Sequence, residues 1–147
     1  MPAKNRYYPN SGVSSLGHAI PAAIGARFAE DKAVFAIIGD GGFQMCCMEI
    51  MTAVNYHFPM TIIMFNNSTM GLIRKNQFQQ YDKHYINCDF VNPDYEFLSK
   101  SFGMKYYKVN SETDLKKLLA GLDYQKSINL IEIMIDKDIF PNYSSGR

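Results

Sequence analysis

Two apolar runs that end abruptly in small polar residues constrain the fold of this chain most strongly. Ala33–Ile38 is followed by Gly39-Asp40-Gly41-Gly42, and Met60–Phe65 is followed by Asn66-Asn67-Ser68-Thr69. Continuous apolar runs of this length are expected of strands that are covered on both faces of a parallel sheet. If the two strands are parallel neighbours, Asp40 and Asn67 meet at their carboxyl ends, where open α/β sheets hold their ligands.

The residue types at these strand ends predict a diphosphate that is held through a divalent metal ion. Asp40 offers a carboxylate and Asn67 an amide oxygen, both hard ligands of the kind that Mg²⁺ takes when it also holds a phosphate. The glycines allow the backbone to turn sharply and approach an anion, and the next helix would point its N–H groups at that anion. A lone Gly-Asp-Gly also fits an ordinary turn, but a second polar strand end after twenty-four intervening residues favours the ligand site.

The remaining patterns alternate between helix and strand, which predicts a doubly wound α/β domain, a parallel sheet with helices on both faces. Asp94 is a suitable N-cap for one helix, and Ser111 opens a capping box for another. Besides the two central strands, helices are predicted from near 17–21 to 29, at about 44–56, within 68–78 after a loop, at 95–102 and at 111–123. Further strands are predicted at 105–109 and 129–135.

Periodicity also predicts which side chains are buried. A set at helical spacing is expected to face the sheet and belong to the core: Met45, Met48, Met51 and Thr52. A second set forms the expected buried stripe of the helix over 111–123: Leu115, Leu118, Leu119 and Leu122. Small residues leave one face of the first helix nearly bare, which permits close packing on another element: Ala22, Gly25, Ala26 and Ala29.

Length and composition narrow the functional classes. The 147 residues predict one domain over 1–147, and a formal charge of +1 gives no electrostatic case for nucleic acid or an anionic membrane surface. No apolar run approaches the roughly 20 residues of a membrane span, and the first residues lack the apolar core of a secretory signal. Cys46 and Cys47 fall inside a predicted helix, so we expect buried, reduced thiols and a cytoplasmic location.

Several motifs occur together in an order and spacing that resemble a known family. They are Ser11-Gly12, Leu16-Gly17, the run from Ile20 to Gly25, the run from Gly39 to Met45, Asn66-Asn67, the run from Met70 to Arg74, and Phe140-Pro141. Together they resemble the C-terminal, diphosphate-binding domain of acetolactate synthase-type thiamine diphosphate enzymes. The resemblance covers nearly the whole chain, and the paired glycine and asparagine motifs are its most specific part.

The resemblance implies the cofactors thiamine diphosphate and Mg²⁺ and a role for each matching residue. Asp40 and Asn67 would supply side-chain oxygens to Mg²⁺, and Thr69 its backbone carbonyl. The implied cofactor contacts are Ser14 through its main-chain carbonyl, Leu16 as the apolar prop under the bent cofactor, Gly39, Gly41 and Gly42 along the diphosphate, and Met70 beside it. No residue of this chain is an implied catalytic residue, because the activating glutamate of the family comes from a separate pyrimidine-binding domain.

The implied reaction is that of a lyase or transferase on a 2-oxo acid: decarboxylation with formation of a carbon–carbon bond. Asn76 departs from the family, since acetolactate synthases commonly carry a tryptophan there and this chain has none. Arg74 is either a clamp for the substrate carboxylate or a surface charge on its helix. The implied partner is the missing pyrimidine-binding domain, across a dimer interface of a homo-oligomer, so the chain is expected to be an excised domain, a truncated product or one subunit of a split enzyme.

Two other functions remain open from the sequence. One is a subunit of a split 2-oxo acid decarboxylase or oxidoreductase, although such subunits usually lack the pattern from Met70 to Arg74. The other is a non-catalytic module that binds thiamine diphosphate. A dinucleotide site is disfavoured, because no Gly-x-Gly-x-x-Gly opens a helix here.

We predict that this chain alone does not turn over a 2-oxo acid, because it has no match to the domain that carries the activating glutamate. The measurement is carbon dioxide release from pyruvate with thiamine diphosphate and Mg²⁺ and no second protein. Measurable release under these conditions would contradict the prediction.

Overall fold

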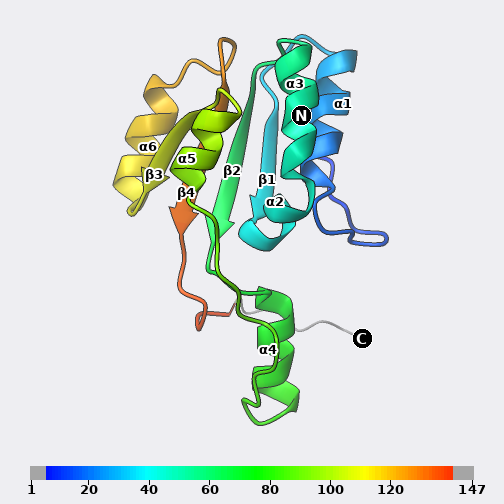
Figure 1. Ribbon diagram of the computed structural model, residues 1–147, viewed down its shortest axis with the longest axis vertical. Helices are drawn as coiled ribbons and strands as arrows, with labels where there is room; N and C mark the ends of the chain where they lie inside the picture. The colour runs from blue at the N-terminus through cyan, green and yellow to red at the C-terminus, as the bar shows by residue number, and fades with distance from the viewer. Residues whose placement is uncertain (1–5, 141–147) are drawn as a thin grey trace, which may run out of the picture.

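β1 (Phe35–Gly39) and β2 (Met60–Asn66) are parallel neighbours, as their sequence pattern predicts. In the computed structural model, which describes residues 6–140, they form a four-stranded, all-parallel sheet with β3 (Lys105–Val109) and β4 (Ile128–Met134), in the order β1-β2-β4-β3 (Figure 1). The helices are α1 (Ala19–Ala29), α2 (Asp40–Cys46), α3 (Ile50–Asn55), α4 (Gly71–Gln80), α5 (Tyr95–Ser101) and α6 (Glu112–Gly121), with a 3₁₀ turn, η1 (Cys47–Glu49), between α2 and α3. The predicted α/β fold with a parallel sheet is confirmed.

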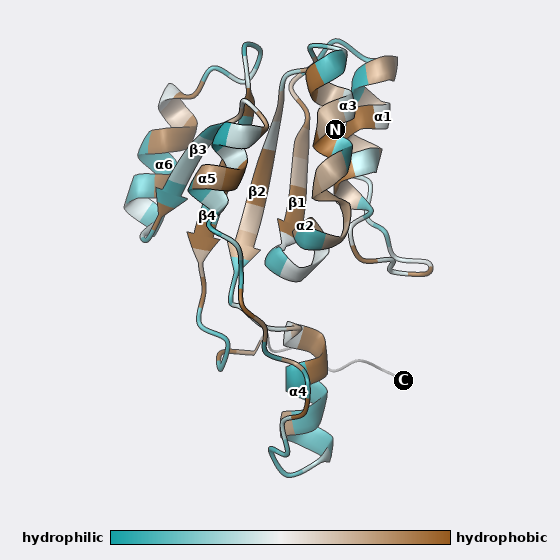
Figure 2. Ribbon diagram, viewed as in Figure 1, coloured by the Kyte–Doolittle hydropathy of each residue, from teal (hydrophilic) through white to brown (hydrophobic). Residues whose placement is uncertain are grey.

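One face of the sheet carries the core. Side chains from α1, α3 and α5 pack there against alternate residues of the strands, among them Ile20, Ile50, Ile62, Tyr95 and Leu130. Figure 2 shows β1 and β2 as mainly hydrophobic segments and β3, at the opposite edge of the sheet, as more hydrophilic. This covered face fixes the register of the sheet, because a slip by one residue would turn the apolar side chains of a strand to its other face.

The expectation that the first strand is covered on both faces is wrong. Along β1, Ala36 and Ile38 are buried in the core, whereas Phe35 and Ile37 point to the opposite face and are exposed. β1 lies at the edge of the sheet. On its exposed face, the ring of Tyr124, which follows α6, packs on Phe35. Successive side chains of a strand point to opposite faces, so one uncovered face exposes every second residue.

The expected helix over 44–56 differs from the structure in its start and its continuity. Helical geometry begins at Asp40, directly after β1, and the 3₁₀ turn η1 separates α2 from α3. The side chains of this segment that are fully buried are Phe43, Ile50 and Ala53. The three methionines expected in the core are exposed instead: Met45, Met48 and Met51. Cys46 and Cys47 are half-buried free thiols rather than buried ones.

The two predicted helix caps are confirmed. Asp94 accepts a hydrogen bond from the N–H of Phe97 at 3.0 Å, and Ser111 accepts one from the N–H of Asp114 at 3.1 Å. The leucine stripe of α6 is only half-buried, because within residues 6–140 this helix packs against β3 at the edge of the sheet. The expected stripe is therefore present but incompletely covered.

α4 stands apart from the other helices. It extends from the carboxyl-end edge of the sheet, beside the described end of the chain (Figure 1). Its Phe78 ring packs on Phe140 with centroids 5.1 Å apart, and Leu72 and Ile73 are exposed. None of the helices between residues 6 and 140 combines the length and apolar character that a membrane span requires.

We predict that Ile62→Ala lowers the free energy of unfolding by about 2–5 kcal/mol, because it leaves a cavity at a fully buried position of β2. Ile37→Ala is the matched control on β1, where the side chain is 57% exposed, and should lower it by less than about 1 kcal/mol. Urea denaturation of both variants measures the two losses. Equal losses would contradict the packing described for the two faces.

Candidate functional site

The residues that follow β1 and β2 form one polar cluster at the carboxyl edge of the sheet. Gly39 lies opposite Phe65 in the register of the two strands, so Asp40 and Asn66 follow at the same level. Asn67 lies one residue further along the loop. Parallel pairing therefore brings the two motifs together, with Asn66 as the direct neighbour of Asp40.

The carboxylate of Asp40 is almost fully buried and is held by three N–H donors. Its Oδ1 accepts the N–H of Gly41 at 3.0 Å. Its Oδ2 accepts the N–H of Ser68 at 2.7 Å and the Nδ2 of Asn92 at 2.9 Å. Each carboxylate oxygen has about two acceptor positions, so Oδ2 is filled while Oδ1 keeps one position for a further ligand.

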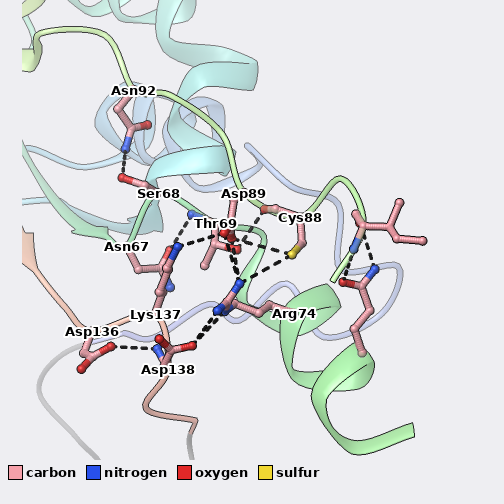
Figure 3. A network of polar contacts seen from close by, with 12 residues as sticks. Asn67, Ser68, Thr69, Arg74, Cys88, Asp89, Asn92, Asp136, Lys137 and Asp138 are labelled. Atoms are coloured by element: carbon pink, nitrogen blue, oxygen red, sulfur yellow. Dashed lines mark hydrogen bonds and ion pairs between the residues drawn. The ribbon is translucent and has the colours of Figure 1, made fainter. Parts of the chain in front are cut away.

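The loop that carries Asn67 and Thr69 is folded so that two oxygens remain available. The Oδ1 of Asn67 accepts the N–H of Thr69 at 3.3 Å, and the Thr69 hydroxyl donates to the carbonyl of Cys88 at 2.9 Å (Figure 3). Ser68 and Met70 exchange backbone hydrogen bonds with residues 88 and 90 on either side of the Thr69–Asp89 bridge. Among the described residues, no hydrogen bond reaches the carbonyl of Thr69.

The glycines after β1 are closely packed. A Cβ on Gly41 would lie 3.0 Å from the Cε of Met70, and one on Gly42 would lie 3.1 Å from the Cγ1 of Ile38 and 3.3 Å from the N of Gly17. A side chain at Gly41 would have to displace the flexible end of Met70, and one at Gly42 would press on Ile38 and on the backbone of Gly17. Met70, half-buried, lies against the Gly41 backbone, and this contact places it beside the predicted diphosphate position.

Ser14 and Leu16 lie in the loop before α1 and are exposed. Ser14 has a positive φ of 56° and Gly17 one of 85°, and Gly17 packs against the start of α2. The loop therefore arrives next to the polar cluster, but no described hydrogen bond joins Ser14 to it. The roles expected for Ser14 and Leu16 stay predictions.

Asn66 connects this cluster to a buried carboxylate on β4. Its Nδ2 donates to Glu132, which also accepts the hydroxyl of Tyr106. Its Oδ1 accepts the N–H of Ser68 at 3.2 Å and the Nδ2 of Asn92 at 2.8 Å. Burial, together with the bond to Glu132, raises the pKa of Tyr106 above its usual value, so its hydroxyl keeps its proton and remains a donor.

A family model described as "Thiamine pyrophosphate enzyme, C-terminal TPP binding domain" matches residues 1–133. The chain belongs to this family. It is 35% identical, over 97% of its length, to the acetolactate synthase large subunit of Corynebacterium glutamicum, and 31% identical, over 96%, to that of Lactococcus lactis. It is also 31% identical, over 93% of its length, to the 3D-(3,5/4)-trihydroxycyclohexane-1,2-dione hydrolase of Lacticaseibacillus casei.

This thiamine diphosphate-binding domain spans about a quarter of the length of the curated relatives it matches, namely 24%, 27% and 22% of those three proteins. The resemblance inferred from the motifs is thus confirmed at the level of the family. The similarity to acetolactate synthase large subunits is confirmed as well.

The chemistry of the donor set fits a magnesium ion bound together with a diphosphate. No group of three or more His, Cys, Asp or Glu side chains suited to a metal occurs in the part of the chain that the structure describes. An ion here would therefore take neutral oxygens beside the Asp40 carboxylate. Mg²⁺ binds in this way, through one or two carboxylates, retained waters and substrate phosphates.

Arg74 is not a surface charge, and its guanidinium already pairs with two carboxylates of this chain. It is buried at the start of α4, with its Nε 3.1 Å and its Nη2 2.7 Å from the Oδ1 of Asp138, and its Nη1 3.1 Å from the Oδ1 of Asp89 (Figure 3). Its guanidinium carbon also lies 3.9 Å from the centre of the Tyr85 ring. The hydrogen bond to Asp138 raises the pKa of Arg74, and the residue ties α4 to two later segments.

Three polar residues of the cluster escaped prediction from the sequence. Asn66 is adjacent to the expected ligand, but nothing in the sequence shows that it turns towards β4. Glu132 gave a signal, since it is the one charge in an apolar strand. Asn92 gave none: it lies 52 positions after Asp40 in a segment without periodicity.

We predict that the Asp89 carboxyl titrates near pH 2. The hydrogen bond from Lys137, together with the charges of Arg74 and Lys137, lowers its pKa to about 2. A pKa that is lower in the folded state stabilises the fold above the unfolded value near 3.9, and this contribution is lost as the pH falls through about 2. Carboxyl ¹³C NMR measures the titration midpoint.

Lys137→Met should raise the midpoint of Asp89 towards its ordinary value, because it removes the strongest of these interactions. Lys117→Met removes an exposed lysine on α6 and is the matched control. A midpoint near 4 in the unsubstituted protein would show that the network around Arg74 does not form.

Proposed function

We propose that this domain holds the diphosphate and Mg²⁺ of thiamine diphosphate in an enzyme that acts on a 2-oxo acid. The observation that carries the proposal is the meeting of β1 and β2, where the Asp40 carboxylate keeps one acceptor position and the Thr69 carbonyl has no described partner. Asn67 would complete the protein ligands with its amide oxygen. Membership of the family supports the cofactor assignment.

Thiamine diphosphate, when bound, supplies carbanion stabilisation, which is chemistry that the protein lacks. The residues of this chain anchor and orient it. Asp40 would offset the charge of the metal ion in a buried site, and the closely packed backbone at Gly41 and Gly42 would follow the diphosphate. Leu16 would support the bent conformer from the loop before α1. The group that activates the cofactor would come from the pyrimidine-binding domain.

For the reaction we propose decarboxylation of a 2-oxo acid with formation of a carbon–carbon bond, a lyase and transferase activity. Similarity to acetolactate synthase large subunits supports it. A second candidate is hydrolysis of a cyclic 1,2-dione, because other relatives of similar identity carry that name. Supplying the pyrimidine-binding domain, in one polypeptide or as a second chain, allows both substrates to be assayed side by side.

The partner that we propose is that pyrimidine-binding domain, within a homo-oligomer. The bare face of α1 supports an interface: Ala22, Gly25 and Ala29 are exposed, and a Cβ on Gly25 would meet no other atom within 4 Å. Exposed apolar side chains nearby include Phe28, Met48 and Tyr56. Apolar surface of this kind marks interaction sites when it is contiguous. The three free cysteines agree with a cytoplasmic location.

We predict that Asp40→Ala weakens the metal-dependent binding of thiamine diphosphate by more than about 100-fold, beyond the loss typical of residues that only support a ligand. Asn67→Ala should act in the same direction but less strongly, because it removes a neutral oxygen. Calorimetry on the enzyme reconstituted with the proposed partner domain measures both affinities.

Neither substitution should unfold the domain, because both residues follow the carboxyl ends of strands rather than lying within the hydrophobic core. A thermal unfolding scan checks this. Asn55→Ala, at the exposed end of α3, is the matched control and should keep the original affinity. If Asp40→Ala bound the cofactor as tightly as the unsubstituted enzyme, the proposed site would be wrong.

A further inference from the structure

Asn92 joins three segments of the polar cluster through one side-chain amide. Its Nδ2 lies 2.9 Å from the Oδ2 of Asp40, 2.8 Å from the Oδ1 of Asn66 and 3.1 Å from the Oγ of Ser68. Figure 3 shows Asn92 entering from the segment before α5, with its nitrogen directed at Ser68. Asn92 thus bridges the end of β1, the loop after β2 and the start of α5.

The orientation of this amide is fixed from its other side. The Oδ1 of Asn92 accepts the Nε2 of Gln44 at 2.6 Å and the hydroxyl of Tyr95 at 2.8 Å. A flipped amide would direct its NH₂ group at two donors and its oxygen at the oxygens of Asp40 and Asn66. Burial raises the pKa of Tyr95 to about 12, so its hydroxyl remains a donor. Because the Asp40 carboxylate can only accept hydrogen bonds, the NH₂ group of Asn92 faces the cluster.

This orientation decides which oxygen of Asp40 is available. With Asn92 and the N–H of Ser68 on Oδ2, that oxygen has no acceptor position left, and only Oδ1 can take a metal ion. The carboxylate is then restricted to binding through one oxygen. The same amide holds Asn66 and Ser68, which precede Asn67 and Thr69 in the loop.

We infer that Asn92 is a positioning residue of the metal site, which restricts Asp40 to a single metal-binding oxygen and holds the 66–69 loop beside it. This inference rests on the proposed function, since it concerns the metal ion that the domain would hold. A restricted carboxylate suits Mg²⁺, which requires near-ideal octahedral geometry. Ca²⁺ accepts carboxylates through both oxygens. Asn92 therefore contributes to metal selectivity as well as to affinity.

The test uses the 147-residue chain with Mn²⁺ and thiamine diphosphate as probes. Mn²⁺ broadens NMR signals of nearby amides, so titration of a ¹⁵N-labelled sample gives the metal concentration at which the signals of Gly41, Ser68 and Thr69 are half lost. Displacement of Mn²⁺ by Mg²⁺ and by Ca²⁺ gives the ratio of their affinities. The same spectra, without metal, show whether each variant keeps its fold.

Asn92→Leu keeps the shape of the side chain but has no donor, and Asn92→Ala is the second variant should leucine disturb the packing. Both should raise the Mn²⁺ concentration at which half of the amide signal is lost by about 10–100-fold. Both should also lower the ratio of Mg²⁺ to Ca²⁺ affinity, because Asp40 can then bind through both oxygens. Tyr95→Phe is the graded variant: it removes one of the two bonds to Oδ1 of Asn92 and leaves the donors to Asp40 in place, so it should lose less affinity than the Asn92 variants and keep the metal ratio.

The outcomes separate this inference from the proposed function. Asn92 variants that keep both the affinity and the metal ratio, while Asp40→Ala loses binding, would overturn the inference and leave the proposed function standing. An equal loss in the Asn92 variants and in Tyr95→Phe, with an unchanged metal ratio, would show a purely structural role and also overturn it. If the unsubstituted chain shows no broadening at these amides, also after the pyrimidine-binding domain is added, both the proposed function and the inference are wrong.

Discussion

The parallel pairing of β1 with β2 is the constraint on which the site depends. Because the two strands end at the same level, Asp40 can accept the N–H of Ser68 across the strand ends. A buried carboxylate without such donors would be strongly destabilising. The hydrogen bonds that satisfy the Asp40 carboxylate in the interior therefore also fix the direction in which its remaining acceptor position points.

A second buried carboxylate extends this arrangement into the sheet. Glu132 on β4 accepts hydrogen bonds from Asn66 and from Tyr106 of the neighbouring β3. Lys108 lies 3.9 Å from it, as the nearest positive charge. Buried polar networks are stable when each member is satisfied. Here the network links three strands, so the loop after β2 is held by the sheet rather than by its own conformation alone.

α4 and the segment around residues 85–89 form a separate unit beyond the sheet. Arg74 connects them through Asp89 and Asp138 and stacks on Tyr85. The bridge between Thr69 and Asp89 attaches this unit to the loop of the candidate site. Backbone hydrogen bonds from Met70 to Cys88 and from Phe90 to Ser68 thus join this unit to the loop that carries Thr69.

The sequence by itself determined the parts that depend on local pattern. The apolar runs with polar ends predicted two parallel neighbours, the caps at Asp94 and Ser111 were found where their residue types predict them, and the motifs identified the family. Only the tertiary structure decided contacts between distant segments. Asn92 and Glu132 lie far from Asp40 along the chain. The methionines of α2, η1 and α3 face outward, while Phe43, Ile50 and Ala53 of the same segment face the core. Hydrophobic periodicity and secondary-structure propensity depend on residues that are close in sequence. The contacts between distant segments depend on how the sheet brings separate strands and loops together.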